Sequence, residues 1–191
     1  MDEEKLVRGL KDRDPAALQE WLHRDGDRLL RSAFLLCGSE ADAQDLAQET
    51  FLQALHSVQR FGGRSSVYTW LHGILLNLSR HYHRDRKRMV YDEALVEQAM
   101  PVAAEPPVPM DEKLASLTLA QALNRLSAAH REVLVLRFYE DLKIDEIAER
   151  LGVSRGTVKS RLHYALDRMQ QLLPAEMNLF GARGTERTER A

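Results

Sequence analysis

The sequence is poor in cysteine and in long apolar runs, and each shortage excludes a class of protein. Its single cysteine, Cys37, cannot form an internal disulfide, which excludes a disulfide-stabilised secreted domain. The longest stretch without a charged residue, 65–79, is broken by Ser, Thr, His, Gly and Asn, so it cannot serve as a transmembrane span. The first residues, MDEEKLVRGLKDRDP, are charged throughout and lack the apolar core of a secretory signal. We therefore expect a cytoplasmic protein with no membrane insertion.

Proline is scarce too, and most of it falls in one acidic segment. Four of the six prolines lie between residues 101 and 109, and the stretch 89–112 carries six acidic residues but no Lys or Arg. Because proline removes a backbone donor and favours an extended chain, this composition predicts a semi-rigid linker. The predicted organisation is a first domain at 1–90, a linker at 91–112, a second domain at 113–173 and a flexible C-terminal extension at 174–191.

Elsewhere the apolar residues recur with the period of an α-helix, and the alternation typical of strands is hard to find. Signals for the start of a helix accompany these runs. Asp14 precedes Pro15, and Ser127 and Ser154 each stand just before a new apolar run. The sequence therefore predicts an all-α fold of about seven or eight helices, arranged as two small helical domains.

The formal net charge of −2 conceals two basic segments. Residues 60–88 contain seven Lys and Arg against Asp85, and residues 150–169 contain five against Asp167. Basic patches neutralise phosphates and release counterions, which gives affinity for any nucleic acid. A solvated helix face would also be basic, but one such segment in each predicted domain favours nucleic-acid binding.

Residues 143–169 have the pattern of a helix-turn-helix. Ala148 allows two helices to approach closely, Gly152 can adopt the positive φ of a tight turn, and Val158 and Leu162 share one inward face. A basic helical hairpin within a bundle is the alternative. The helix before this motif is expected to bury Val133, Leu134, Leu136, Phe138 and Tyr139 as its scaffold. Facing outward on the second helix, where they could reach a major groove, are Arg155, Thr157, Lys159, Ser160, His163 and Tyr164.

The first predicted domain combines an acidic helix with an aromatic and basic segment. Asp42, Asp45 and Glu49 recur on one helix face, which a basic partner could bind, although solvation alone would explain them. In the segment that follows, aromatic residues alternate with cations, an arrangement that can stack an unpaired base and hold its phosphates. We expect Trp70 to lie in the core, and Tyr68 and Asn77 to be exposed.

Three stretches together resemble an extracytoplasmic-function (ECF) sigma factor, a two-domain bacterial transcription initiation factor. They are DAQDLAQETF, then SSVYTWLHGILLN running into RDRKR, then LSAAHREVLVLRFYEDLKIDEIAERLGVSRGTVKSRLHYAL. The resemblance covers about residues 12–173 and is specific, because two independent motif sets occur in the order of the family. It implies a protein that directs core RNA polymerase to promoters, without catalysis or a cofactor of its own.

The resemblance also assigns roles to individual residues. Contacts with the clamp helices of the polymerase's largest subunit are implied for Gln44, Asp45, Gln48 and Glu49. Recognition and opening of the −10 element are implied for Arg64, Ser65, Tyr68, Asn77, Arg80, His81, Arg84, Lys87 and Arg88. Recognition of the −35 element is implied for Arg155, Thr157, Lys159, Ser160, Arg161, His163 and Tyr164. The second domain is further expected at the polymerase flap. Many such factors are held inactive by an anti-sigma factor, so the resemblance also suggests that partner.

Three other interpretations use the same residues. A zinc enzyme could employ His56, His72, His81, His83 and Cys37, but on a helix residues two apart point to different sides. A helix-turn-helix regulator acting without polymerase would be expected to dimerise on a palindromic site. A protein-interaction adaptor using only the acidic stripe would leave both basic segments unexplained.

Overall fold

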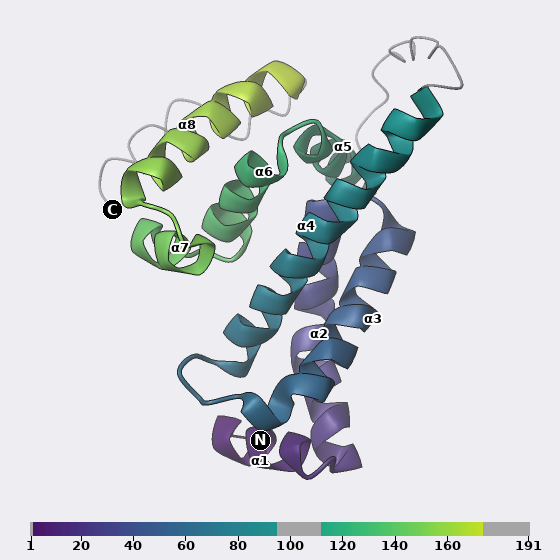
Figure 1. Ribbon diagram of the computed structural model, residues 1–191, viewed down its shortest axis with the longest axis vertical. Coiled ribbons are helices and arrows are strands. Elements are labelled where there is room, and N and C mark those ends of the chain that lie inside the picture. The colour runs from purple at the N-terminus through teal and green to yellow at the C-terminus, as the bar shows by residue number, and fades with distance from the viewer. Residues whose placement is uncertain (1, 95–111, 174–191) are drawn as a thin grey trace.

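The computed structural model describes residues 2–94 and 112–173, and these residues form eight α-helices and no strand (Figure 1). The all-α prediction is thus confirmed for the described part of the chain. Most of the predicted linker and the whole C-terminal extension lie outside it. Two helices reach into the predicted linker, since α4 continues to Ala94 and α5 begins at Glu112.

The N-terminal half consists of four helices that begin at side-chain caps or in tight loops. Asp14 accepts a hydrogen bond from the amide of Ala16 at 3.0 Å while Pro15 occupies the first helical position, which confirms the predicted helix start. Ser39 caps the third helix in the same way. The helices are α1 (Glu3–Lys11), α2 (Pro15–Cys37), α3 (Glu40–Ser57) and α4 (Val67–Ala94), with a short 3₁₀ turn at Val58–Arg60.

The core of this half lies between α2, α3 and α4. Trp21 is buried and meets the ring of Phe51 edge-on, with ring centroids 4.9 Å apart. Leu71 and Leu75 present the apolar face of α4 to the same core. Trp70 is half-buried and packs on the rim of this core against Phe61, so the expected core position is reached only in part.

The C-terminal half contains the predicted helix-turn-helix. Ser127 and Ser154 cap their helices, and Gly152 takes a φ of 65° where α7 turns into α8. Val158 and Leu162 are fully buried, as their spacing predicted. The helices are α5 (Glu112–Asn124), α6 (Ala128–Leu134), α7 (Ile144–Leu151) and α8 (Arg155–Leu172), with a π-helical turn at Val135–Tyr139 after α6.

The π-helical turn explains why one core prediction is wrong. Phe138 was expected inside, but its side chain is 47% exposed, and Tyr139 is half-buried. A π turn needs more residues per turn than an α-helix, so it shifts the faces on which the residues after Val135 lie. Val133, Leu134 and Leu136 precede or begin that shift and are buried as predicted.

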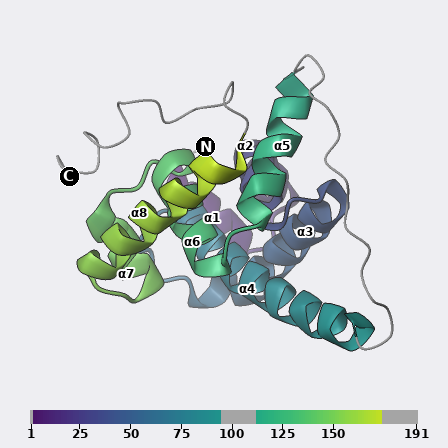
Figure 2. The same ribbon diagram turned by 90° about the horizontal axis from the view of Figure 1, so that it is seen from above.

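The two halves pack directly against each other. Seen from above (Figure 2), α6 lies between α8 and α4, and α5 packs against α2. At the centre, the buried side chain of Arg131 donates to the carbonyl of Leu123 at 2.8 Å and also reaches the carbonyl of Leu36 on α2. Gly38 ends α2 with a φ of 76°, and a Cβ there would clash with the side chain of Asn124. The C-terminal end of α2 therefore packs closely against Asn124 of the C-terminal half.

Candidate nucleic-acid and polymerase interface

One face of α3 carries the acidic stripe. Its inward residues Ala43, Leu46 and Ala47 are buried against the core, so helix geometry turns the intervening polar residues outward. Asp42 at the start of the helix is different, because it accepts a hydrogen bond from the hydroxyl of Tyr82 on α4 at 2.8 Å. The four residues with the implied polymerase contacts are all exposed on this one face: Gln44, Asp45, Gln48 and Glu49.

The loop before α4 exposes Arg64 and Ser65. Ser66 caps α4, accepting from the amide of Thr69 at 3.0 Å, and the carboxylate of Glu3 on α1 accepts from the amide of Val67. A cavity of about 500 Å³ lies between this loop and α1. Asn77 and Arg80 do not reach it, since they line a separate cavity of about 340 Å³ together with Trp70 and Arg150 of α7.

Tyr68 is not exposed as expected, because the C-terminal half covers it. Its hydroxyl donates to Oε1 of Glu140 at 2.8 Å, and the Arg28 guanidinium lies 4.1 Å from the centroid of its ring. Arg28 also donates to the other oxygen of Glu140 at 2.6 Å. Burial, followed by the charge of Glu140, raises the pKa of the Tyr68 hydroxyl well above its usual value. Tyr68 is therefore a neutral hydrogen-bond donor held against the second domain.

Arg80 is bound to the second domain in a similar way. Its Nε and Nη2 each lie 2.7 Å from an oxygen of Glu132, the two-pronged geometry of a strong Arg–carboxylate pair. Glu132 is buried, and this hydrogen bonding raises the pKa of Arg80. Asn77, one turn earlier on α4, is exposed as predicted. Two residues with implied −10 roles, Tyr68 and Arg80, thus donate hydrogen bonds to carboxylates of the C-terminal half.

His72 lies beneath this junction and is completely buried. Its Nε2 lies 2.8 Å from the hydroxyl oxygen of Ser32 and 3.3 Å from Oε1 of Glu140. Burial, helped by the positive charges of Arg150 and Arg28, lowers its pKa to about 3. The ring is therefore neutral at physiological pH, and its contact with Glu140 is not an ion pair.

Sequence reasoning missed the carboxylates and the arginine of this junction. Glu132, Glu140 and Arg28 were given no role, because each binds a residue more than 35 positions away. A signal was present, since the charged residues Arg131, Glu132 and Glu140 directly flank the apolar-rich segment 133–139. Charged residues at buried positions have to be paired, which predicts a partner but not its identity.

The second half of α4 carries the remaining −10 candidates. His81 and Arg84 are exposed and contact each other, while the half-buried His83 directs Nε2 to the carbonyl oxygen of Leu36 at 2.7 Å. Lys87 and Arg88 lie on the same helix, but their side chains are not described. Among the residues that the structure describes, no three His, Cys, Asp or Glu side chains are grouped as metal ligands.

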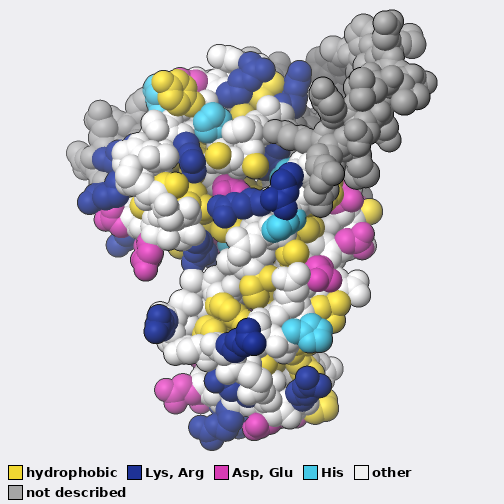
Figure 3. Space-filling view, in the orientation of Figure 1, with side chains coloured by type: hydrophobic (Ala, Val, Ile, Leu, Met, Phe, Trp, Pro, Cys, Tyr) yellow, Lys and Arg dark blue, Asp and Glu magenta, His cyan; other side chains and the backbone are white. Residues whose placement is uncertain are grey.

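The outward face of α8 carries the −35 candidates. Lys159, Ser160 and His163 are exposed, and Tyr164 is 63% exposed although it is aromatic. Arg155 at the first turn pairs with Asp145 of α7 at 2.6 Å. Thr157 and Arg161 are half-buried at the edge of this face. Lys and Arg side chains, with acidic ones among them, are visible over this half of the molecule in Figure 3.

Two family models match the chain, and they divide it as the structure does. Sigma-70 region 2 matches residues 21–89, which cover most of α2 together with α3 and α4 up to the charged end. Sigma-70 region 4 matches residues 122–171, which run from the end of α5 through α8. No helix in the described ranges is long and apolar enough to cross a membrane.

Characterised sigma factors are similar along most of the chain. The ECF RNA polymerase sigma factor SigE of Mycolicibacterium smegmatis is 37% identical over 167 residues, which are 84% of this chain and 64% of that protein. The RNA polymerase sigma-E factor of Streptomyces coelicolor is 34% identical over 173 residues, 90% of this chain and 93% of that protein. Among solved structures, the sigma factor RpoE in complex with the anti-sigma factor NepR from Bartonella quintana matches with a TM-score of 0.65 and 29% identity, covering 84% of this chain and 98% of that one. The chain therefore belongs to the ECF sigma factors, which carry sigma-70 regions 2 and 4 and direct transcription initiation by RNA polymerase.

Proposed function

We propose that this sigma factor docks on core polymerase through the exposed face of α3. Support comes from the geometry, since Gln44, Asp45, Gln48 and Glu49 share that face and none is covered by the C-terminal half. Such a polar and acidic face suits a basic partner surface, here the clamp helices of the largest subunit. The polymerase supplies the chemistry, and the sigma factor contributes binding energy and position. A cytoplasmic location belongs to the same proposal.

Region 2 would recognise and open the −10 element. Arg64 and Ser65 in the loop and Asn77, His81 and Arg84 along α4 form an exposed series of polar and basic groups. Extruding a base from the stack costs a few kcal/mol, which contacts to the base and its phosphates can offset. Tyr68 and Arg80 would join this surface once Glu140 and Glu132 release them, and Lys87 and Arg88 complete the assigned set.

Region 4 would read the −35 element with α8 in the major groove. In this motif the second helix contacts base edges and phosphates, and its exposed face here carries Arg155, Lys159, Ser160, His163 and Tyr164. Thr157 and Arg161 flank that face, where Arg161 could reach a phosphate. Region 4 would lie at the polymerase flap when it binds the promoter.

The arrangement of the two regions supports a resting state that binds DNA weakly. Tyr68 and Arg80 cannot hold DNA while they hold Glu140 and Glu132, so promoter binding requires the two regions to separate. Polymerase would drive that separation by binding each region at a different place. The similar sigma factor RpoE of Bartonella quintana forms a complex with the anti-sigma factor NepR. An anti-sigma factor of this chain would oppose the separation by binding the closed form.

The proposal rests most directly on the exposed acidic face of α3 in a chain that matches both sigma regions. Run-off transcription with bacterial core polymerase and a promoter library tests it. Asp45→Arg should abolish the start sites that depend on the protein, whereas Asp27→Arg, an exposed acid on α2, should leave them unchanged. Lys159→Ala should weaken or change the promoters used, while Gln170→Ala, an exposed residue near the other end of α8, should not. Full activity of Asp45→Arg would exclude α3 as the docking face.

A further inference from the structure

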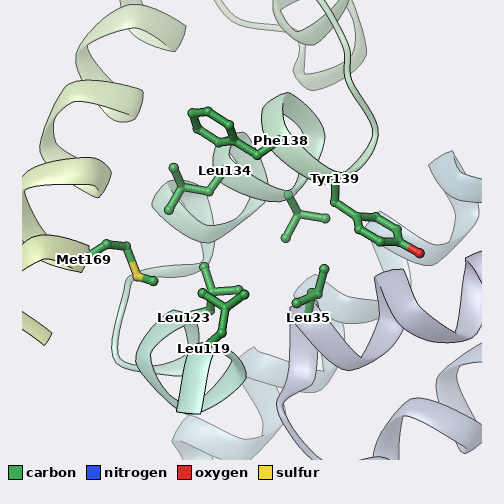
Figure 4. Close-up of a pocket in the computed structure, with 8 residues that line it drawn as sticks. Leu35, Leu119, Leu123, Leu134, Phe138, Tyr139 and Met169 are labelled. Carbon is green, nitrogen blue, oxygen red and sulfur yellow. The ribbon is translucent and has the colours of Figure 1, made fainter. Parts of the chain in front are cut away.

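An apolar groove opens where the two sigma regions meet, with a volume of about 240 Å³. Figure 4 shows side chains from several helices around one opening, with Leu35 of α2 on one side and Leu123 of α5 and Met169 of α8 facing it. Leu134, Phe138 and Tyr139 close the remaining side. Both regions therefore supply walls of the same groove.

The groove is unsuited to water and suited to apolar side chains. A water molecule needs two to four polar partners, roughly, and this lining offers almost none. Phe138 lines the groove and is 47% exposed, so it adds accessible apolar surface to the lining. Apolar surface of this kind marks a place where another apolar group binds.

We propose that the groove binds the chain's own segment 175–180, AEMNLF, which follows α8. The starting point of the segment supports this occupant. Met169 in the last turns of α8 lines the groove, the helix ends at Leu172, and Leu173 is still buried. The chain thus leaves α8 beside the opening. At roughly 3.3 Å per residue, Met177 lies at most about 13 Å of chain beyond Leu173, which is within reach of the opening.

The composition of the segment supports the same occupant. Met177, Leu179 and Phe180 are three large apolar residues within four positions. The residues after them, GARGTERTERA, are small, polar or charged, so the apolar residues of the extension are confined to the part that follows α8 directly in the sequence. Transfer of such side chains from water into an apolar site is favourable by roughly 1.5–3 kcal/mol for each one fully buried.

Binding there would hold the two regions together. An occupant contacts Leu35 of region 2 and Leu123 and Met169 of region 4 at the same time, so it favours the arrangement in which Glu140 and Glu132 hold Tyr68 and Arg80. This consequence rests on the proposed promoter contacts of region 2. The binding itself does not, and it can be measured without polymerase or DNA.

Hydrogen–deuterium exchange on the full-length protein tests the docking. The variant combining Leu179→Asp and Phe180→Asp should raise exchange several-fold in the last turn of α5 and in Val135–Tyr139, because charged side chains do not enter an apolar groove. The matched control, Thr185→Asp with Thr188→Asp, adds the same charge farther along and should leave exchange as in the wild type. Unchanged protection around Leu29 in α2 shows that the fold is intact. Equal exchange in both variants would overturn the proposal.

A second set of variants separates this segment from other occupants. Phe138→Asp should raise exchange in the groove by about as much as the tail variant, and combining the two should add nothing more. Fully additive effects would mean that the segment acts elsewhere and would refute the docking. Protection that falls on tenfold dilution would assign the groove to a second copy of the chain, and would equally refute it. Protection independent of concentration supports the intramolecular segment.

Discussion

Glu140 is a buried carboxylate that joins three parts of the chain. It accepts hydrogen bonds from Tyr68 on α4 and Arg28 on α2, and His72 lies 3.3 Å away. A buried carboxylate keeps its charge only when such donors compensate for lost hydration. The cost of burying Glu140 is therefore tied to the closed arrangement, since separating the regions would return the carboxylate to water.

Replacing Glu140 tests this coupling. Glu140→Ala should lower the free energy of unfolding by about 1–3 kcal/mol, because it leaves the half-buried Tyr68 hydroxyl without an acceptor. Urea denaturation followed by circular dichroism measures the loss. Glu149→Ala, an exposed acid on α7, is the matched control and should change stability by less than about 0.5 kcal/mol. Equal stability of the two variants would show that the carboxylate does not support the fold.

His72 makes stability depend on pH. Its pKa of about 3 in the folded state lies below the usual 6.5, so the unfolded chain takes up a proton that the folded chain refuses. The stabilisation is complete above pH 6.5 and is lost as the pH falls toward 3. The wild type should lose about 2 kcal/mol between pH 7 and pH 5 through this residue.

Urea denaturation at pH 7 and pH 5 measures that loss. His72→Gln should show a correspondingly smaller fall between the two pH values, whatever its absolute stability, while His23→Gln, which changes an exposed histidine, should keep the wild-type dependence. An unchanged pH dependence in His72→Gln would contradict a buried neutral ring.

At the scale of helices, the features that depend on neighbouring residues were predictable. Asp14, Ser127 and Ser154 act within three residues of their own position, so the sequence around them contains the information needed to place them. Phe138 and Tyr68 depend instead on a π-helical turn and on a partner 72 residues away. A burial prediction from apolar periodicity assumes a regular α-helix that is buried only by its own domain. The prediction fails where the helix is irregular or where another domain packs on it. The sequence of each region predicted its helical structure, but not that the two regions pack against each other and bury part of each other's surface.

The turn of the helix-turn-helix offers a test at the same scale. Gly152 has a φ of 65°, and a Cβ there would meet nothing within 4 Å, so conformation alone opposes substitution. Gly152→Ala should cost about 1–2 kcal/mol of stability, and Gly152→Asn clearly less, because asparagine tolerates the left-handed conformation. Thermal unfolding of both variants measures the difference. Equal losses would mean that a clash, rather than backbone conformation, governs this position.

At the scale of the whole molecule, the sigma factor is a pair of binding surfaces that cover part of each other. The acidic face of α3 and the outer face of α8 are open to solvent, whereas Tyr68 and Arg80 are held at the junction. On the proposed assignments, the polymerase-docking face and the outer −35 face are thus available in the closed form, but the −10 surface is incomplete. This order suits a factor that should engage DNA only after it has bound polymerase.

Loosening the junction should make the isolated protein bind DNA. When only a fraction of the molecules is open, the apparent Kd is the intrinsic value divided by that fraction, so a rise in the open population raises affinity in proportion. Glu132→Gln combined with Glu140→Gln should therefore tighten binding to a labelled single-stranded oligonucleotide several-fold. It should also steepen the decline of affinity with salt, since Arg80 becomes free to contact phosphate. Fluorescence anisotropy across a salt series measures both quantities.

The control, Asp27→Asn with Glu149→Gln, removes two acidic charges from exposed positions on α2 and α7 and should produce only the smaller change due to net charge. If the two double variants gained affinity equally, net charge rather than an unmasked −10 surface would explain the effect, and region 4 would not block DNA binding through these carboxylates.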